Sequence, residues 1–333
     1  MKKYFFIFTL LFFSCQEEIT LDIDKSEDRL VVEGAIEPGF PPYIILTRNQ
    51  GYFDNINQDT YRNLFVEDAD IRVSVFDSNQ TLSPIYLKPF IFDSIVVYTD
   101  STYDFKSYYD FSEEGKTYLL EIFWNGDSIT SITSIPESTP LDCLWIEKNE
   151  FSDIYYESDI KAIYPDPSGI QNNVLIENKL FYHQQQDSLT CIVKEQMDPL
   201  LLLLDCGPDN LINGETFETI FPLADKAGFP GKRKFHAEHN ELCKITGDSI
   251  FIEKDIALIK FSQIDEESMR FWRGVVRQAG FNSNPFTEPL NLPGNINGAL
   301  GVWTGYSPVY YMVPIIQGTT IFEQHDPTFI DIL

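Results

Sequence analysis

The order of apolar and polar positions predicts a chain built mainly from β-strands. From Ile71 to Val75 apolar and polar residues alternate strictly, as in a strand that buries one face. About seven such segments, separated by turns rich in Gly, Pro, Asn and Asp, fall within residues 28–137 without a convincing helix. This spacing favours an immunoglobulin-like or transthyretin-like β-sandwich in that part of the chain. The clearest segments are 29–36, 43–47, 71–75, 95–98 and 129–135, together with 114–122, where a turn is followed by a strand.

Residues 138–333 are predicted to form a second, β-rich domain that contains one amphipathic helix. The helix is expected at 263–280, because acidic residues open it and apolar residues such as Met269 and Trp272 follow at helical spacing. The expected strands are 141–147, 173–182, 189–193, 215–221, 250–261, 299–304 and 309–317. The apolar run 200–204 is too short to span a membrane and favours a buried strand or loop.

The first residues indicate export and lipid anchoring. Two lysines precede an apolar run of about ten residues, which is too short for a transmembrane helix and has the length of a signal-peptide core. The run ends at Ser14-Cys15, as bacterial lipoprotein signals do. We therefore expect a signal peptide at 1–14, lipid attachment at Cys15 and a tether at 15–27. An ordinary secretory signal is the alternative interpretation.

The tether is acidic directly after Cys15, and this pattern resembles the signal that sends Bacteroidota lipoproteins to the outer face of the outer membrane. The interpretation predicts an outer-membrane protein, anchored by lipid and exposed at the cell surface. The alternative interpretation is a solvated linker whose acidic residues carry no targeting signal.

Composition excludes one class of partner. The chain has 51 acidic and 24 basic residues and a formal net charge of −27. Nucleic-acid binding requires a basic face, so no nucleic-acid partner is expected. Hydrophobic residues make up 43% of the chain, which is enough to form folded cores.

Four cysteines follow Cys15, and an even number in an exported protein permits two disulfides. Cys191 and Cys206 flank an apolar segment and are the first expected pair, which leaves Cys143 with Cys243. Four reduced, buried thiols are the alternative.

No catalytic or cofactor motif stands out, so we expect a protein that is not an enzyme and holds no cofactor. His236 and His239, close to Cys243, are weak candidates for metal ligands, but their spacing matches no known metal motif. No nucleophile elbow or phosphate loop is present. Carboxylates are so abundant that no particular pair of them indicates glycoside hydrolysis.

A Pro-, Asn- and Gly-rich stretch follows the predicted helix and is the candidate partner-binding loop. A tight loop that packs the last strands is the alternative interpretation. The candidate binding residues are Asn284, Pro285, Phe286, Gly294, Asn295, Asn297 and Gly298.

The segments 284–289 and 294–303, placed after an amphipathic helix, resemble the C-terminal signature of a Bacteroidota lipoprotein family catalogued as domain of unknown function 4249. Leu30-Val31-Val32-Glu33-Gly34 resembles its opening strand, and 70–75 its next one. The resemblance covers nearly the whole chain after Cys15. It implies a surface or outer-membrane lipoprotein that works with a TonB-dependent-transporter-like β-barrel, and it supplies no catalytic residues.

These observations together predict a non-catalytic accessory or ligand-binding partner of an outer-membrane β-barrel, in uptake or in envelope assembly. Two other classes of function remain as alternatives. One is a surface hydrolase that processes glycans or peptides with carboxylates, and the other is a structural or adhesion module.

Overall fold

The structure is a computed structural model of the whole chain. The described residues fall into fifteen stretches with gaps between them. They are 29–49, 61–77, 80–92, 95–104, 107–148, 158–185, 193–198, 201–208, 214–222, 239–242, 247, 249–252, 254–281, 292–315 and 323–328.

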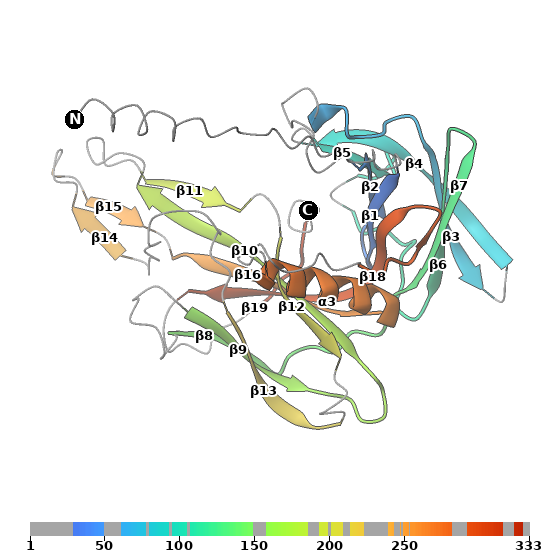
Figure 1. Cartoon of the computed structure of the whole chain (residues 1–333). Helices are drawn as coiled ribbons and strands as arrows, with labels where there is room; N and C mark the ends of the chain where they lie inside the picture. The colour runs from blue at the N-terminus through green and yellow to red at the C-terminus, as the bar shows by residue number, and fades with distance from the viewer. Residues whose placement is uncertain are drawn as a thin grey trace, which may run out of the picture.

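The chain is mainly β, as its sequence predicts, and fourteen strands of the described residues share one large mixed sheet (Figure 1). The strand order is β11-β10-β16-β18-β1-β2-β5-β4-β3-β6-β7-β17, with β12 paired to β10 and β19 to β18. A three-stranded sheet, β13-β9-β8, and a two-stranded sheet, β14-β15, complete the strands in these stretches.

The N-terminal part packs as a sandwich around one hydrophobic core. Its strands are β1 (Leu30–Ile36), β2 (Tyr43–Arg48), β3 (Asp70–Asp77), β4 (Gln80–Phe92), β5 (Ile95–Thr99), β6 (Thr117–Trp124) and β7 (Asp127–Ser134). Val32 and Ile44 pack in this core together with Val73 and Leu120. Burial of such side chains removes apolar area from water at about 25 cal/mol per Å².

The long strand β4 was not predicted from the sequence. Its two prolines argue against a strand, since proline donates no ladder hydrogen bond. In the structure Pro84 lies where the pairing between β3 and β4 shifts register, a place that tolerates proline. The strand then continues to pair with β5, so β4 joins the two layers of the sandwich.

Strand β18 (Leu300–Pro314) connects the two parts of the chain. Its first residues pair in parallel with β1, and the rest pair antiparallel with β16. The side chain of Trp303 is fully buried in the N-terminal core. The sheet therefore crosses the boundary predicted at 137/138. The two final strands predicted at 299–304 and 309–317 are one strand, because paired partners extend along its whole length.

A second packed layer lies against the C-terminal half of the sheet. Leu144 of β8 and Ile160 of β9 pack with Ile176, Ile259 and Tyr311 of the main sheet. The predicted strand 250–261 is divided into β15 and β16, because Asp255 between them binds the backbone of His183. The remaining strands are β8 (Cys143–Lys148), β9 (Ser158–Pro165), β10 (Asn173–Gln185), β11 (Val193–Met197), β12 (Leu202–Pro208), β13 (Thr216–Pro222), β14 (His239–Leu242), β15 (Ser249–Ile252), β16 (Ile256–Ile264), β17 (Ile296–Asn297) and β19 (Glu323–Gln324).

Helix α3 (Glu266–Phe281) covers the other face of this half of the sheet (Figure 1). It begins three residues later than predicted, because Asp265 is its N-cap. One oxygen of Asp265 accepts the N–H of Ser268 at 2.8 Å, and the other accepts the N–H of Ser134 at 3.1 Å. The cap thus ties the start of the helix to β7.

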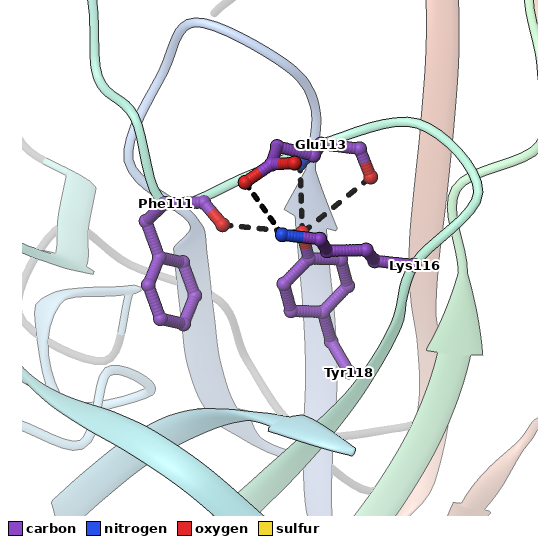
Figure 2. A network of polar contacts seen from close by, with 4 residues as sticks. All are labelled: Phe111, Glu113, Lys116 and Tyr118. Carbon is purple, nitrogen blue, oxygen red and sulfur yellow. Dashed lines mark hydrogen bonds and ion pairs between the residues drawn. The ribbon is translucent and has the colours of Figure 1, made fainter. Parts of the chain in front are cut away.

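The turn before β6 is fixed by Tyr118 (Figure 2). Its hydroxyl donates to the carbonyl of Phe111 at 3.1 Å and accepts the N–H of Glu113 at 2.7 Å. Lys116 forms an ion pair with the Glu113 carboxylate above it. A tyrosine that bonds back to the backbone at the start of a strand resembles the tyrosine corner of immunoglobulin-like sandwiches.

Candidate functional site

A cavity of about 360 Å³ opens on the face of the main sheet beside α3. It lies where β1, β2 and β5 of the N-terminal part meet β10, β16 and β18. Lys260 and Tyr306 are buried at its floor, whereas Tyr61 and Glu33 are exposed at its rim. Its apolar walls are Ile45, Leu64, Phe65, Phe92, Ile95 and Val97. We call this cavity the Lys260 pocket.

Strand register explains why charged groups meet here. Glu177 on β10, Lys260 on β16 and Tyr310 on β18 are direct neighbours in three adjacent strands, so their side chains leave the same face. On β1 the side chains alternate, and Val32 enters the sandwich core while Glu33 takes the pocket side. Glu37 follows the end of β1, and its side chain contacts Lys260 and Tyr310 on this face of the sheet.

Lys260 is held by a buried ion pair. Its Nζ lies 2.7 Å from Oε2 of Glu37, and both side chains are almost fully buried, at 2% and 3% exposure. The hydroxyl of Tyr310 donates to Oε1 of Glu37 at 2.7 Å. Within the described residues, Oε1 of Glu37 thus accepts a hydrogen bond, whereas Oε2 has the ion pair with Lys260 and no hydrogen bond of good geometry. The ion pair offsets part of the cost of burying the two charges.

Aromatic rings surround the same ammonium group. The Nζ of Lys260 lies 4.3 Å from the ring centroid of Tyr306 and 5.7 Å from that of Tyr310. Both distances are within the range of a cation–π interaction. Burial is the main cause that raises the pKa of the phenols of Tyr43, Tyr306 and Tyr310 well above its ordinary value, so these phenols are neutral.

Glu177 and Glu33 supply negative charge that Lys260 does not balance. Oε2 of Glu177 is buried without a hydrogen-bond partner among the described residues, and it lies 3.9 Å from Nζ of Lys260. Burial raises the pKa of the Glu177 carboxyl, against a smaller lowering by Lys260. Desolvation by the surrounding protein also raises the pKa of the Glu33 carboxyl, although part of this side chain reaches solvent at the rim of the pocket. The pocket lining thus combines two carboxyl groups, those of Glu33 and Glu177, with the ammonium group of Lys260, which Glu37 contacts from outside the lining.

The predicted partner loop is only partly within the described residues. Asn284, Pro285 and Phe286 lie outside them. Asn297 and Gly298 are exposed, as a binding surface requires. Gly294 is exposed too, but a side chain there would collide with the carbonyl of Gly301, so its backbone packs closely on β18.

The structure also places the predicted cysteines. Cys143 and Cys206 are free thiols among the described residues. Their expected partners, Cys243 and Cys191, lie outside these residues, so the expected pairing stays a prediction. The Sγ of Cys206 lies 3.6 Å from the carbonyl oxygen of Met269 on α3. The lipid-attachment candidate Cys15 also lies outside these residues.

The weak metal candidates do not form a site in the described stretches. His236 lies outside them, and His239 begins β14. In the part of the chain that the structure describes, no three His, Cys, Asp or Glu side chains gather closely enough to hold a metal ion.

Sequence reasoning missed the residues of the Lys260 pocket. A signal was present, because Lys260 interrupts the apolar run 256–264 and Glu33 interrupts 30–36. A charge at a buried strand position has to find a partner. The identity of that partner depends on strands that are distant in the sequence.

The fold and pocket define a β-rich protein with a sandwich-like N-terminal part and a ligand-sized cavity on its central sheet. A family model described as "Domain of unknown function (DUF4249)" matches residues 16–310, and the chain belongs to this family. No curated protein matches the chain.

Two solved structures of Salmonella alpha-2-macroglobulin are similar at low scores. A mutant form has a TM-score of 0.22 and 8% identity, and the match covers 88% of this chain and 15% of that one. The form reacted with methylamine has a TM-score of 0.21 and 9% identity, with 74% and 14% covered. Scores at this level carry no structural argument. None of the helices within the described stretches has the length and hydropathy needed to cross a bilayer.

Proposed function

We propose that this protein is a lipid-anchored, surface-exposed binding protein of the bacterial outer membrane, attached through Cys15. It acts without catalysis as an accessory of a TonB-dependent-transporter-like β-barrel, in uptake or in envelope assembly. The observation that carries the binding function is the Lys260 pocket. Its volume of about 360 Å³ suits a small ligand, and its wall combines apolar side chains with a few polar groups.

The position of the pocket supports a role in binding. It is formed by strands of both parts of the chain, around the pairing of β1 with β18. A ligand there touches both parts at once. The signal-like N-terminus and the family resemblance support the membrane and barrel components of the proposal.

Affinity purification of the lipidated full chain from detergent-solubilised envelopes tests the accessory role. A β-barrel that co-purifies in stoichiometric amount is the expected result, and mass spectrometry identifies its type. The Cys15→Ser variant is the matched control, because it lacks only the thiol that carries lipid. A full chain that repeatedly co-purifies with no barrel contradicts the accessory role.

A hydrolase that uses carboxylates is a second candidate, and one observation favours it. Glu33 and Glu177 both line the pocket, and the pKa of each carboxyl is raised. Glycoside hydrolases use two carboxyl groups, and the one that acts as general acid has a raised pKa. Turnover of a surface glycan that is lost in Glu177→Gln, while the fold is intact, would replace the binding proposal by this one.

A further inference from the structure

We propose that the Lys260 pocket binds a small organic cation, with a primary ammonium group attached to an apolar body. This inference rests on the proposed binding function and adds the class of ligand.

The first argument is the charge balance of the pocket. Lys260 is already committed to Glu37 at 2.7 Å, and Tyr310 satisfies the other oxygen of Glu37. Glu177 has a buried oxygen without a hydrogen bond, and Glu33 adds a further carboxyl at the rim. A buried carboxylate oxygen without a hydrogen bond is costly, and Lys260 lies 3.9 Å away, beyond hydrogen-bond distance. A ligand that brings positive charge and N–H donors is therefore favoured there.

The second argument is the chemistry of the walls. Tyr306 already presents its ring to the ammonium of Lys260 at 4.3 Å, so a cation is accommodated beside this ring. Tyr43 and Tyr61 add two further rings to the lining, next to the apolar side chains of Phe65 and Val97. These surfaces suit the apolar body of an amine.

A metal ion suits the pocket less well than an organic cation. Metal binding requires ligand atoms that converge on one point at about 2.0–2.6 Å. The described carboxyl groups of the pocket do not gather in this way. Their spread around the lining fits a ligand of several atoms.

Binding is expected to depend on pH. The titratable groups that interact with Glu177 are Lys260 on β16, Glu37 and Glu33 near β1, the thiol of Cys206 on β12, and the phenols of Tyr43, Tyr306 and Tyr310. Burial favours the protonated form of Glu177, and an incoming cation favours the ionised form. The complex therefore releases protons as it forms, and its affinity rises as the pH increases.

Calorimetry with three probes of matched shape tests the inference on the full chain in neutral detergent. The probes are 2-phenylethylammonium, 2-phenylethanol and phenylacetate, which differ mainly in charge. We expect the cation to bind at least about tenfold more tightly than the neutral alcohol, and phenylacetate to bind most weakly. Titrations in two buffers of different ionisation enthalpy are expected to show proton release on binding of the cation.

Two variants test whether the preference for the cation depends on Glu177. Glu177→Gln keeps the shape of the side chain, and we expect it to reduce the affinity of the cation about tenfold or more while leaving that of the alcohol unchanged. Glu215→Gln changes an exposed carboxyl outside the pocket lining and is expected to leave both affinities unchanged.

The outcomes separate this inference from the proposed function. If the alcohol or phenylacetate binds as tightly as the cation or more tightly, the proposed preference for a cation is wrong. The pocket would still be a ligand-binding site. If the cation binds equally well to Glu177→Gln, the ammonium group does not bind beside Glu177. Absence of binding by all three probes overturns the inference, and the proposed accessory role is then contradicted only if the lipidated chain also captures no barrel.

Discussion

The side chain of Asn295 holds the backbone of Trp303 with two hydrogen bonds. Its Nδ2 donates to the Trp303 carbonyl at 2.7 Å, and its Oδ1 accepts the Trp303 N–H at 2.9 Å. The carbonyl of Asn295 also accepts the hydroxyl of Ser131 on β7 at 2.9 Å. This residue of the predicted partner loop therefore fixes β18 against the N-terminal sandwich, and exposed Asn297 beside it is the better candidate for contact with a partner.

We expect Asn295→Ala to destabilise the protein by ~2 kcal/mol, because it leaves two backbone groups of a buried residue without partners. Denaturant unfolding followed by tryptophan fluorescence measures the change. Asn297→Ala is the control, and it is expected to change the free energy of unfolding by less than ~0.5 kcal/mol, since its side chain is exposed. Equal effects of the two changes would contradict the role of Asn295 as a clamp.

Gly301 allows β1 and β18 to approach each other. Its φ is +110°, and a Cβ at this position would collide with the carbonyl oxygen of Val32. We expect Gly301→Ala to destabilise the protein by more than ~2 kcal/mol, because it adds overpacking to backbone strain. Gly126→Ala is the matched control, since Gly126 has a φ of +91° with open space around it, and it is expected to cost ~1 kcal/mol. A similar cost for both variants would argue against close pairing of β1 and β18.

The Glu177 carboxyl is expected to make stability depend on pH. Burial raises its pKa in the folded chain above the ordinary value of 4.5, so the folded state binds its proton more tightly than the unfolded state. Its destabilising effect is therefore absent below about pH 4.5, and it increases as the pH rises through the raised pKa. We expect Glu177→Gln to be more stable than the unchanged chain at neutral pH, with a difference that disappears in acid.

Unfolding curves at several pH values measure this difference, with Glu215→Gln as the exposed control. A Glu177→Gln variant that is less stable than the unchanged chain at neutral pH would show that the attraction between Glu177 and Lys260 exceeds the cost of burial.

Cys206 is expected to resist alkylation in the folded protein. Burial, assisted by the charge of Asp205, raises the pKa of its thiol to about 12, so very little thiolate is present at neutral pH. Iodoacetamide labelling followed by peptide mass spectrometry is expected to modify the less buried Cys143 first and to reach Cys206 only after unfolding. Failure to label Cys206 in unfolded, unreduced protein would show that it is in a disulfide.

Several elements follow from local sequence alone. The alternation at 71–75 specifies a strand with one buried face, and the acidic residues before Met269 specify the start of a helix, because these patterns depend on neighbours within one or two turns. The same local rules mark Asn125-Gly126 as the turn between β6 and β7, where both residues have positive φ. The membership of the family also follows from the sequence, through the order of its motifs.

Other elements depend on residues that are far apart in the chain. Proline at positions 84 and 89 argues locally against a strand, but the register shift between β3 and β4 accommodates Pro84. The parallel pairing of β1 with β18 joins residues separated by almost the whole chain, and no periodicity encodes that choice of partner. The sequence shows that Lys260 and Glu33 interrupt apolar strands. Only the tertiary structure places Lys260 beside Glu37 and Glu177, because strand order decides which buried charges become neighbours.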